Sequence, residues 1–311
     1  METLVLTQAS DPMRADDMPP GVRIVRPIVL RRPHSIIPGF GLTLGLTLAW
    51  LGLIVMLPLV ALFARAAALD ASRFIETVTS DRVVAALRLS FGASLAAGLA
   101  NAAFGAVLAW VLVRYRFFGR RLVDALVDVP FALPTAVAGI ALAALYAKNG
   151  WVGGSVNWLL GLVGLPGIKI AFSPLGIVIA LVFIGVPFVV RTVQPIMEEI
   201  DREVEVAAAT LGASRFQSIY RVILPSLFPA ILTGFALAFA RAAGEYGSVI
   251  FIAGNIPYVS EIAPLLIIIK LEEFNYAGAT AIGTVMLAVA FIMLFVINLI
   301  QAWTRRYANV A

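Results

Sequence analysis

Six long apolar stretches constrain the fold of this chain more than any other feature of its sequence. They cover roughly residues 37–63, 85–113, 123–147, 171–193, 226–253 and 279–303. The hydrocarbon core of a bilayer is about 30 Å thick, and a helix needs about 20 apolar residues to cross it. Each stretch is long enough, and none alternates with the period of two that a membrane β-strand requires. The sequence therefore predicts an all-α integral membrane protein with six transmembrane helices.

The composition agrees with this prediction and excludes several kinds of site. Of the 311 residues, 61% are hydrophobic and 13% are charged, about half the charged fraction of a soluble domain. The chain has no cysteine and a single histidine, His34, so the usual ligands of an intramembrane zinc, haem or iron–sulfur site are missing. We expect this chain to bind no metal and no cofactor of its own.

The distribution of Lys and Arg predicts the orientation of the spans. Residues that flank the spans on the side of the N-terminus include fifteen of the 23 basic residues: Arg14, Arg23, Arg26, Arg31, Arg32, Arg114, Arg116, Arg120, Arg121, Arg191, Arg202, Arg215, Arg221, Arg305 and Arg306. Cytoplasmic loops carry the excess of Lys and Arg, so both termini are predicted in the cytoplasm. The pI and the net charge of +5 then reflect topology rather than nucleic-acid binding.

Three regions follow along the chain. Residues 1–35 are rich in Pro, Arg and Asp and are predicted to form a disordered cytoplasmic tail. They are not a cleavable signal peptide, because the apolar run that follows exceeds the ~7–15 residues of such a signal. Residues 36–304 form the six-span domain, and residues 305–311 form a short cytoplasmic tail.

One polar loop between the spans, residues 195–225, has a helical pattern of its own. A first helix is predicted from about Pro195 to Leu211, with Gly212 as the left-handed residue that ends it. Ser214 and Gln217 form a capping box that begins a second helix, and Pro225 is expected to end it. Small residues beside the turn would admit a partner closely, so we interpret this loop, called the hairpin below, as a docking surface. The alternative is an amphipathic hairpin that lies on the membrane surface.

The hairpin resembles the coupling motif of ABC-importer permeases, Glu-Ala-Ala-x3-Gly-x9-Ile-x-Leu-Pro. The residues in register or beside the turn are Glu205, Ala207, Ala208, Gly212, Ala213, Ser214, Leu224 and Pro225. Two positions depart from the motif: Val206 replaces its Glu and Val222 its Ile. Glu205 is adjacent, but neighbouring helix positions point about 100° apart, so it does not substitute in geometry. The charge of the motif is therefore missing at this position, while the small residues that give its shape are retained.

The resemblance extends over roughly residues 38–303. The segments 128–139, 185–195, 244–255 and 260–270 are similar to the T-type permease subunit of sulfate/thiosulfate ABC importers. This resemblance implies a heterodimer with a second, homologous permease subunit, two ATPase subunits that carry the ATP, and a periplasmic sulfate- or thiosulfate-binding protein. It also implies a location in the bacterial inner membrane, in contact with lipid. The chain itself lacks the phosphate-binding Gly-x4-Gly-Lys-Ser/Thr loop and is expected to be a pore subunit, not an enzyme.

Charged residues inside the predicted spans are candidates for the translocation path. Arg241 and Glu245 share a helix face, and Gly244, Gly247 and Ser248 lie beside them. Intramembrane charges are expensive and are usually functional. Arg241 is a candidate site for the anion at the path or its gate. The alternative is an ion pair that fixes the fifth span.

Two carboxylates, Asp124 and Asp128, begin the third span four residues apart. Like charges at this spacing repel, so they require partners. Arg120 and Arg121 lie one turn before them, and a solvated interfacial cluster is the favoured interpretation.

Three other functions remain open from the sequence. A molybdate or tungstate permease of the same family is the main alternative, because these oxyanions resemble sulfate in charge and shape. An intramembrane enzyme would need a His-Glu-x-x-His motif or an acid–base pair deep in a span, and none is evident. An ion-driven carrier would take up its substrate without an ATPase.

Overall fold

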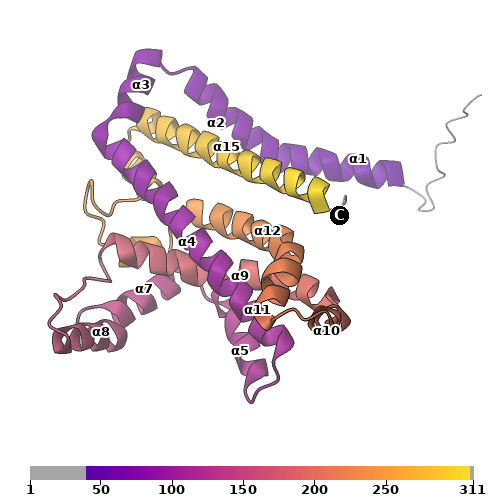
Figure 1. Cartoon of the computed structure of the whole chain (residues 1–311). Coiled ribbons are helices and arrows are strands. Elements are labelled where there is room, and N and C mark those ends of the chain that lie inside the picture. Colours follow the sequence, from indigo (N-terminus) through magenta and orange to yellow (C-terminus); the bar gives the residue numbers. More distant parts are fainter. Residues whose placement is uncertain (1–39, 309–311) are drawn as a thin grey trace, which may run out of the picture. The chain divides into compact units, whose positions relative to one another are not determined.

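The computed structural model describes residues 40–308, which fold into helices joined by short connections (Figure 1). The predicted disordered tail, residues 1–35 with His34, lies outside the described residues. The chain divides into two compact units, Met1–Met56 and Leu57–Ala311. Of the first unit, the structure describes α1 (Phe40–Leu51) and the π-helical turn η2 (Gly52–Met56).

The second unit holds the remaining helices in the following order. They are α2 (Leu57–Ala67), α3 (Ala71–Thr79), α4 (Asp81–Arg114), α5 (Arg120–Val127), α6 (Val129–Ala132), α7 (Thr135–Tyr146), α8 (Trp151–Leu162), α9 (Pro174–Glu199), α10 (Arg202–Thr210), α11 (Arg215–Ser218), η3 (Ile219–Ile223), α12 (Leu224–Ala243), α13 (Val249–Ile252), α14 (Ala263–Glu272) and α15 (Tyr276–Ala308).

Five continuous helices in the described part of the chain are long and apolar enough to cross a membrane. They are Phe40–Ala67, Asp81–Arg114, Pro174–Glu199, Arg215–Ala243 and Tyr276–Ala302. They coincide with five of the six predicted spans. The multi-pass, all-helical membrane fold is therefore confirmed for the described residues.

The third predicted span, residues 123–147, is not one continuous helix. It is divided into α5, α6 and α7, with breaks at Asp128 and at Leu133–Pro134. Pro130 lacks the N–H that would continue α5 through Asp128, and Pro134 restricts the residue before it to an extended conformation. Leu133 is extended, with φ −85° and ψ 132°. The count of six spans is therefore not exactly confirmed, because residues 123–147 form no single continuous helix.

The centre of the second unit is the packing of α4, α9 and α12 against one another. Val189 of α9 lies between two glycines. A Cβ added at Gly105 of α4 would lie 2.8 Å from the Val189 Cβ, and one added at Gly234 of α12 would lie 2.8 Å from the Val189 Cα. Helices in lipid associate through such close backbone approach rather than through the hydrophobic effect. Gly105 of α4 and Gly234 of α12 therefore allow the close packing of this three-helix core.

Candidate functional site

The hairpin begins where α9 ends. Helix α9 continues through Pro195 to Glu199, and a separate helix, α10, begins at Arg202. The carboxylate of Asp201 accepts a hydrogen bond from the Glu203 N–H at 3.0 Å, so it caps the new helix. The prediction of one helix from Pro195 to Leu211 was wrong, because Asp201 begins a helix in the middle of that range.

The turn of the hairpin has the predicted geometry. Gly212 has φ +83°, in the left-handed region that glycine adopts without strain. The Gln217 N–H donates to the Ser214 Oγ at 3.3 Å, and the Ser214 N–H donates to the Gln217 Oε1 at 2.8 Å. The capping box is confirmed, and it fixes the direction in which the second helix leaves the turn.

The second helix of the hairpin does not end at Pro225. Residues Arg215–Ala243 form one continuous helix, in which residues 219–223 are π-helical. A π-helical turn is one of the local adjustments that accommodate a proline within a helix. The second helix of the hairpin therefore continues into α12 without a break, so a displacement of the turn would also displace α12.

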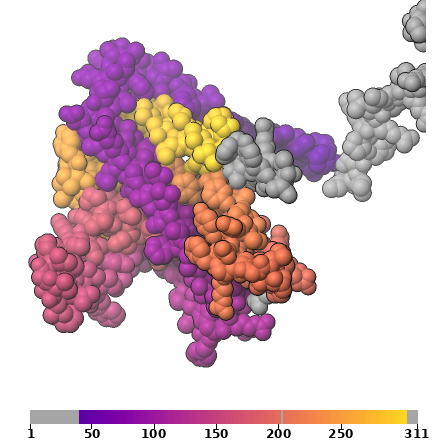
Figure 2. Space-filling model, in the orientation of Figure 1, coloured from indigo at the N-terminus to yellow at the C-terminus, as the bar shows by residue number. Residues whose placement is uncertain are grey.

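The outer surface of the hairpin is apolar and exposed. Leu211 is 88% exposed and Phe216 74%. The Phe216 and Tyr220 rings are stacked, with centroids 6.1 Å apart and planes 4° apart. A groove of about 500 Å³ opens beside them, and Ala209, Ala213 and Val206 are among the residues that line it. Figure 2 shows this region, in orange, on the surface of the unit.

The other residues predicted for the hairpin occupy different positions on it. Ala207, Leu224 and Pro225 are exposed, and Ala208 is half-buried. In the second helix of the hairpin, Ile223 is 1% exposed and packs into the core, whereas Phe216 and Tyr220 are exposed. The apolar residues of this helix are therefore divided between the core and the exposed surface.

Glu205 points back toward its own chain. Its Oε1 lies 3.0 Å from the Nη2 of Arg114, the last residue of α4, and the Arg114 side chain is 10% exposed. Arg114 also donates to the backbone carbonyl of Ile200 at 3.1 Å. The adjacent Val206 is 62% exposed. Glu205 therefore ties the hairpin to α4, and the outward position of the motif is held by an apolar side chain.

For the coupling role that the resemblance implies, we expect Val206→Glu to change ATPase activity by less than about fivefold. The side chain is exposed, and a single exposed charge is worth roughly 0–1 kcal/mol. The measurement is substrate-stimulated ATPase activity of the assembled transporter. A gain of tenfold or more would show that the partner offers a cation at this position.

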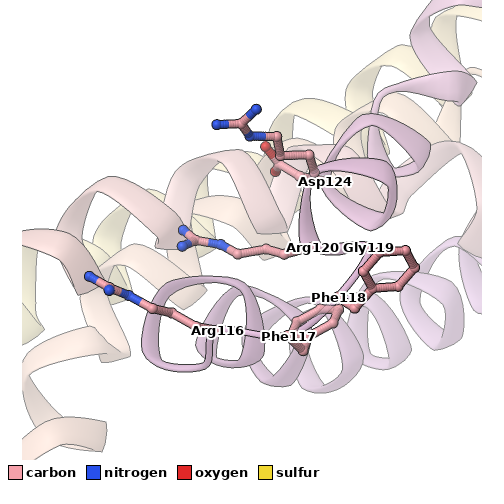
Figure 3. Close-up of a pocket in the computed structure, with 7 residues that line it drawn as sticks. Arg116, Phe117, Phe118, Gly119, Arg120 and Asp124 are labelled. Atoms are coloured by element: carbon pink, nitrogen blue, oxygen red, sulfur yellow. The ribbon is translucent and has the colours of Figure 1, made fainter.

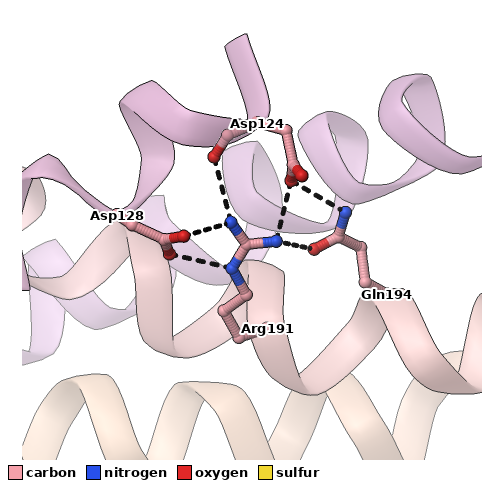
Figure 4. Close-up of polar contacts among 4 residues, drawn as sticks. All are labelled: Asp124, Asp128, Arg191 and Gln194. Atoms are coloured by element: carbon pink, nitrogen blue, oxygen red, sulfur yellow. Dashed lines mark hydrogen bonds and ion pairs between the residues drawn. The ribbon is translucent and has the colours of Figure 1, made fainter. Parts of the chain in front are cut away.

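A second polar cluster surrounds Arg191 of α9 (Figure 4). Its Nε and Nη2 donate to the two carboxylate oxygens of Asp128 at 2.9 and 2.6 Å, and its Nη1 donates to Asp124 Oδ1 at 2.7 Å. Nη2 also donates to the Asp124 carbonyl at 3.0 Å, and Gln194 donates to Asp124 Oδ1 at 3.3 Å. The cation required by the two aspartates is therefore Arg191, not the predicted Arg120 and Arg121. Arg191 and Asp128 are 63 residues apart in the sequence, so local spacing could not identify Arg191 as the partner.

We expect Arg191→Gln to destabilise the protein by about 2 kcal/mol. The pair of like charges at Asp124 and Asp128 would remain without its bidentate cation, although partial exposure reduces the cost. A thermal denaturation curve of the purified protein measures the effect. Adding Asp128→Asn should restore about half of the loss, and a variant as stable as the original chain would contradict this role.

At the predicted intramembrane site, the structure brings Arg241, Glu245 and Ser248 together. Arg241 forms an ion pair with Glu245, which is 4% exposed. The Glu245 Oε1 accepts from the Ser248 N–H at 2.9 Å and from the Ser248 Oγ at 3.0 Å. Glu245 thus organises the break between α12 and α13. The Arg241 side chain remains 37% exposed, and one bond uses only one of its donors.

The two glycines of this site differ in their surroundings. Gly244 ends α12 and has open space where a Cβ would lie, whereas a Cβ at Gly247 would lie 2.3 Å from the Thr135 Oγ1 of α7. Likewise, a Cβ on Gly139 of α7 would lie 2.3 Å from the Ser248 carbonyl oxygen. The segment around Glu245 is therefore fixed against α7 by close backbone contact.

A further ion pair has no signature in the sequence. Arg82 at the start of α4 donates from Nε and Nη2 to Glu261 at 2.8 and 2.7 Å, and Glu261 is 3% exposed. It joins α4 to the connection before α14. Nearby, a hydrogen bond from Lys270 lowers the pKa of the exposed Glu273. Arg82 and Glu261 are 179 residues apart, and nothing in the local pattern of either residue indicates this partner.

Comparison with known proteins places the chain in a family. Residues 101–307 match the model of the family described as "Binding-protein-dependent transport system inner membrane component". A protein of Synechocystis described as "Sulfate transport system permease protein CysT" is 50% identical over 263 residues, which cover 85% of this chain and 90% of the relative. A protein of the same description from Escherichia coli is 47% identical over 269 residues, 86% of this chain and 95% of the relative.

Solved structures with the same fold are more distant in sequence. One described as "a bacterial ABC transporter involved in the import of the acidic polysaccharide alginate" aligns with a TM-score of 0.68 at 18% identity, over 85% of this chain and 96% of the other. Another, of an alginate ABC transporter in complex with a pentasaccharide-bound periplasmic protein, aligns with a TM-score of 0.66 at 19% identity, over 83% of this chain and 92% of the other. These similarities establish the fold.

Proposed function

This chain belongs to the family of binding-protein-dependent transport system inner membrane components, and we propose that it is the membrane-spanning subunit of an ATP-driven importer for sulfate or thiosulfate. It is a transport component rather than a catalyst. Relatives with close to half of their residues identical are described as sulfate permeases, which favours sulfate over molybdate or tungstate. In this proposal the chain forms half of a translocation pore, and a second, homologous permease subunit forms the other half.

The observation that carries the proposal is the hairpin. Its turn is set by Gly212 at φ +83° and by the Ser214–Gln217 capping box, and it presents an exposed apolar surface. An apolar surface held rigidly beside a groove matches the helix-in-groove mode of recognition. We assign this surface to the ATPase subunits, with both termini of the chain and the hairpin in the cytoplasm.

Energetics explains why ATPase subunits are required. Sulfate is a dianion, and each charge costs about 2.3 kcal/mol per 100 mV when moved into a negative interior. At ~150 mV this amounts to about 7 kcal/mol before any concentration gradient. We assign ATP binding and hydrolysis to two separate subunits, whose closure moves α12 through the continuous helix Arg215–Ala243. A periplasmic sulfate-binding protein would deliver the anion from outside and supply most of the selectivity.

Within the pore, we assign the anion contact to Arg241 and the structural role to Glu245. The buried Glu245 carboxylate accepts three hydrogen bonds, one from Arg241 and two from Ser248, whereas Arg241 is partly exposed and has unused N–H groups. A guanidinium presents a planar fork of donors that suits an oxyanion.

A deletion strain tests the substrate class. Bacteria that lack this chain should fail to grow on low sulfate as the sole sulfur source and should grow normally on cysteine. Normal growth on low sulfate, together with loss of molybdenum-enzyme activity that added molybdate restores, would instead assign the chain to molybdate.

A further inference from the structure

The short turn between α4 and α5 gathers three arginines around an open pocket. The pocket, about 600 Å³ in volume, is lined by residues 116–121 and Asp124. Figure 3 shows the Arg116 and Arg120 side chains extending to the same side of the turn, with the Phe117 and Phe118 rings on the other side. Basic and aromatic side chains are thus separated onto two faces of one turn.

Positive charge exceeds negative charge at this turn: three arginines and one carboxylate line the pocket, and that carboxylate, Asp124, is close enough to Arg120 to interact with it electrostatically. None of the ion pairs between described residues involves Arg116, Arg120 or Arg121. Asp124, the one carboxylate in the pocket lining, is already bound by Arg191. Gly119, the N-cap residue of α5, has no side chain to accept from its first turn. An anion placed in the pocket would therefore meet guanidinium groups that form no ion pair among the described residues, at a helix start that lacks a side-chain cap.

An apolar stripe runs from the same turn along α5. Phe118 is 106% exposed just before α5, and Leu122 and Leu126, four residues apart on one side of α5, are 65% and 56% exposed. Val127, by contrast, is 5% exposed and packs into the core. A short helix with basic residues at one end and an exposed apolar stripe is typical of a segment that lies at the membrane interface.

The turn between α4 and α5 lies at a point in the chain where the membrane–water interface is expected. Helix α4 has 34 residues, which span about 51 Å, well beyond the ~30 Å hydrocarbon core. Its last residue, Arg114, is followed at once by this turn and then by the third membrane segment. Arginine groups here can reach lipid phosphates while phenylalanine and leucine side chains enter the acyl region.

We propose that this turn is a binding site for an anionic phospholipid, with Arg116, Arg120 and Arg121 on the headgroup phosphate and Phe118, Leu122 and Leu126 against the acyl chains. The lipid anchors the end of α4 that Arg114 ties to the hairpin through Glu205. The site depends only on location in a membrane, and it stands whether the substrate is sulfate or another anion.

Native mass spectrometry of the full-length protein tests the site. After incubation with equal amounts of phosphatidylglycerol and phosphatidylcholine, the protein should retain phosphatidylglycerol selectively. An arginine near an anionic lipid surface contributes about fivefold in affinity, so Arg116→Gln/Arg120→Gln/Arg121→Gln should lower retention at least tenfold. The control Arg65→Gln/Arg73→Gln/Arg88→Gln removes the same charge from exposed positions elsewhere and should retain the lipid.

Equal retention of both lipids, or an unchanged triple variant, would overturn the proposal. Displacement of phosphatidylglycerol by millimolar inorganic phosphate would also overturn it, because the pocket would then bind free phosphate.

A depth measurement tests the apolar stripe without removing any arginine. The chain has no cysteine, so a spin label can be attached to Phe118→Cys alone in the reconstituted transporter. The label should be accessible to oxygen and protected from an aqueous nickel chelate, and a label at Leu211→Cys in the protein without ATPase should show the reverse. A label at position 118 that is exposed to water, or that is protected only when the ATPase is added, would show that a partner protein rather than lipid covers the turn.

Discussion

Replacing Phe216 with aspartate is expected to abolish ATP-driven uptake, with a loss of at least about a hundredfold. Phe216 is 74% exposed and stacks on Tyr220 at the second helix of the hairpin. In the proposed importer, an ATPase subunit covers this aromatic surface. A carboxylate buried there without a partner costs several kcal/mol, and aromatic anchors commonly dominate the energy of an interface.

Two measurements separate loss of docking from loss of folding. Phe216→Asp should insert into the membrane normally but fail to copurify with the ATPase subunits. The control is Phe274→Asp, which makes the same change at a residue that is 79% exposed and lies far along the chain between α14 and α15. It should copurify with the ATPase as the original chain does. Normal copurification and uptake by Phe216→Asp would refute the docking assignment.

Arg241→Ala is expected to abolish uptake while the complex remains assembled. The substitution removes the guanidinium assigned to the anion, but Glu245 keeps its two bonds from Ser248. The expected loss is about a hundredfold, because a hydrogen bond to a charged group is worth up to about 3 kcal/mol. Initial uptake rates and size-exclusion chromatography of the same preparation measure the two properties.

The matched variant Glu245→Gln separates the two roles assigned to this pair. It keeps Arg241 and removes the buried carboxylate that holds the turn at Ser248. It should lower thermal stability and leave measurable uptake in the molecules that remain folded. A complex that falls apart on Arg241→Ala would instead show that Arg241 is a structural partner of Glu245.

The hairpin shows what the sequence could predict. The left-handed Gly212 and the capping box of Ser214 and Gln217 follow from side-chain chemistry within four residues, and both are confirmed. The apolar spans are equally local, because length and hydropathy alone determine whether a helix can cross a bilayer. The pair Arg241 and Glu245 was also predictable from helical spacing.

The incorrect predictions concern prolines and ion pairs, whose effects depend on how the helices pack against one another. Pro134 breaks the third span, whereas Pro195 and Pro225 lie inside continuous helices, because a π-helical turn or neighbouring groups can accommodate the missing N–H. The partners of Asp128, Glu205 and Glu261 lie on other helices and are defined only when α4, α5, α9 and the hairpin pack. Charge spacing indicated that the aspartates needed a cation, but it could not identify Arg191.

Uptake of radiolabelled sulfate by proteoliposomes tests the proposed function most directly. The proteoliposomes would hold this chain, its sister permease and the ATPase subunits, with the binding protein outside, ATP present or absent inside, and molybdate as a competitor. A sulfate importer driven by ATP should show uptake that requires both ATP and the binding protein and is unaffected by a modest excess of molybdate. Uptake without ATP would contradict an ATP-driven importer, and strong inhibition by molybdate would contradict the assignment to sulfate.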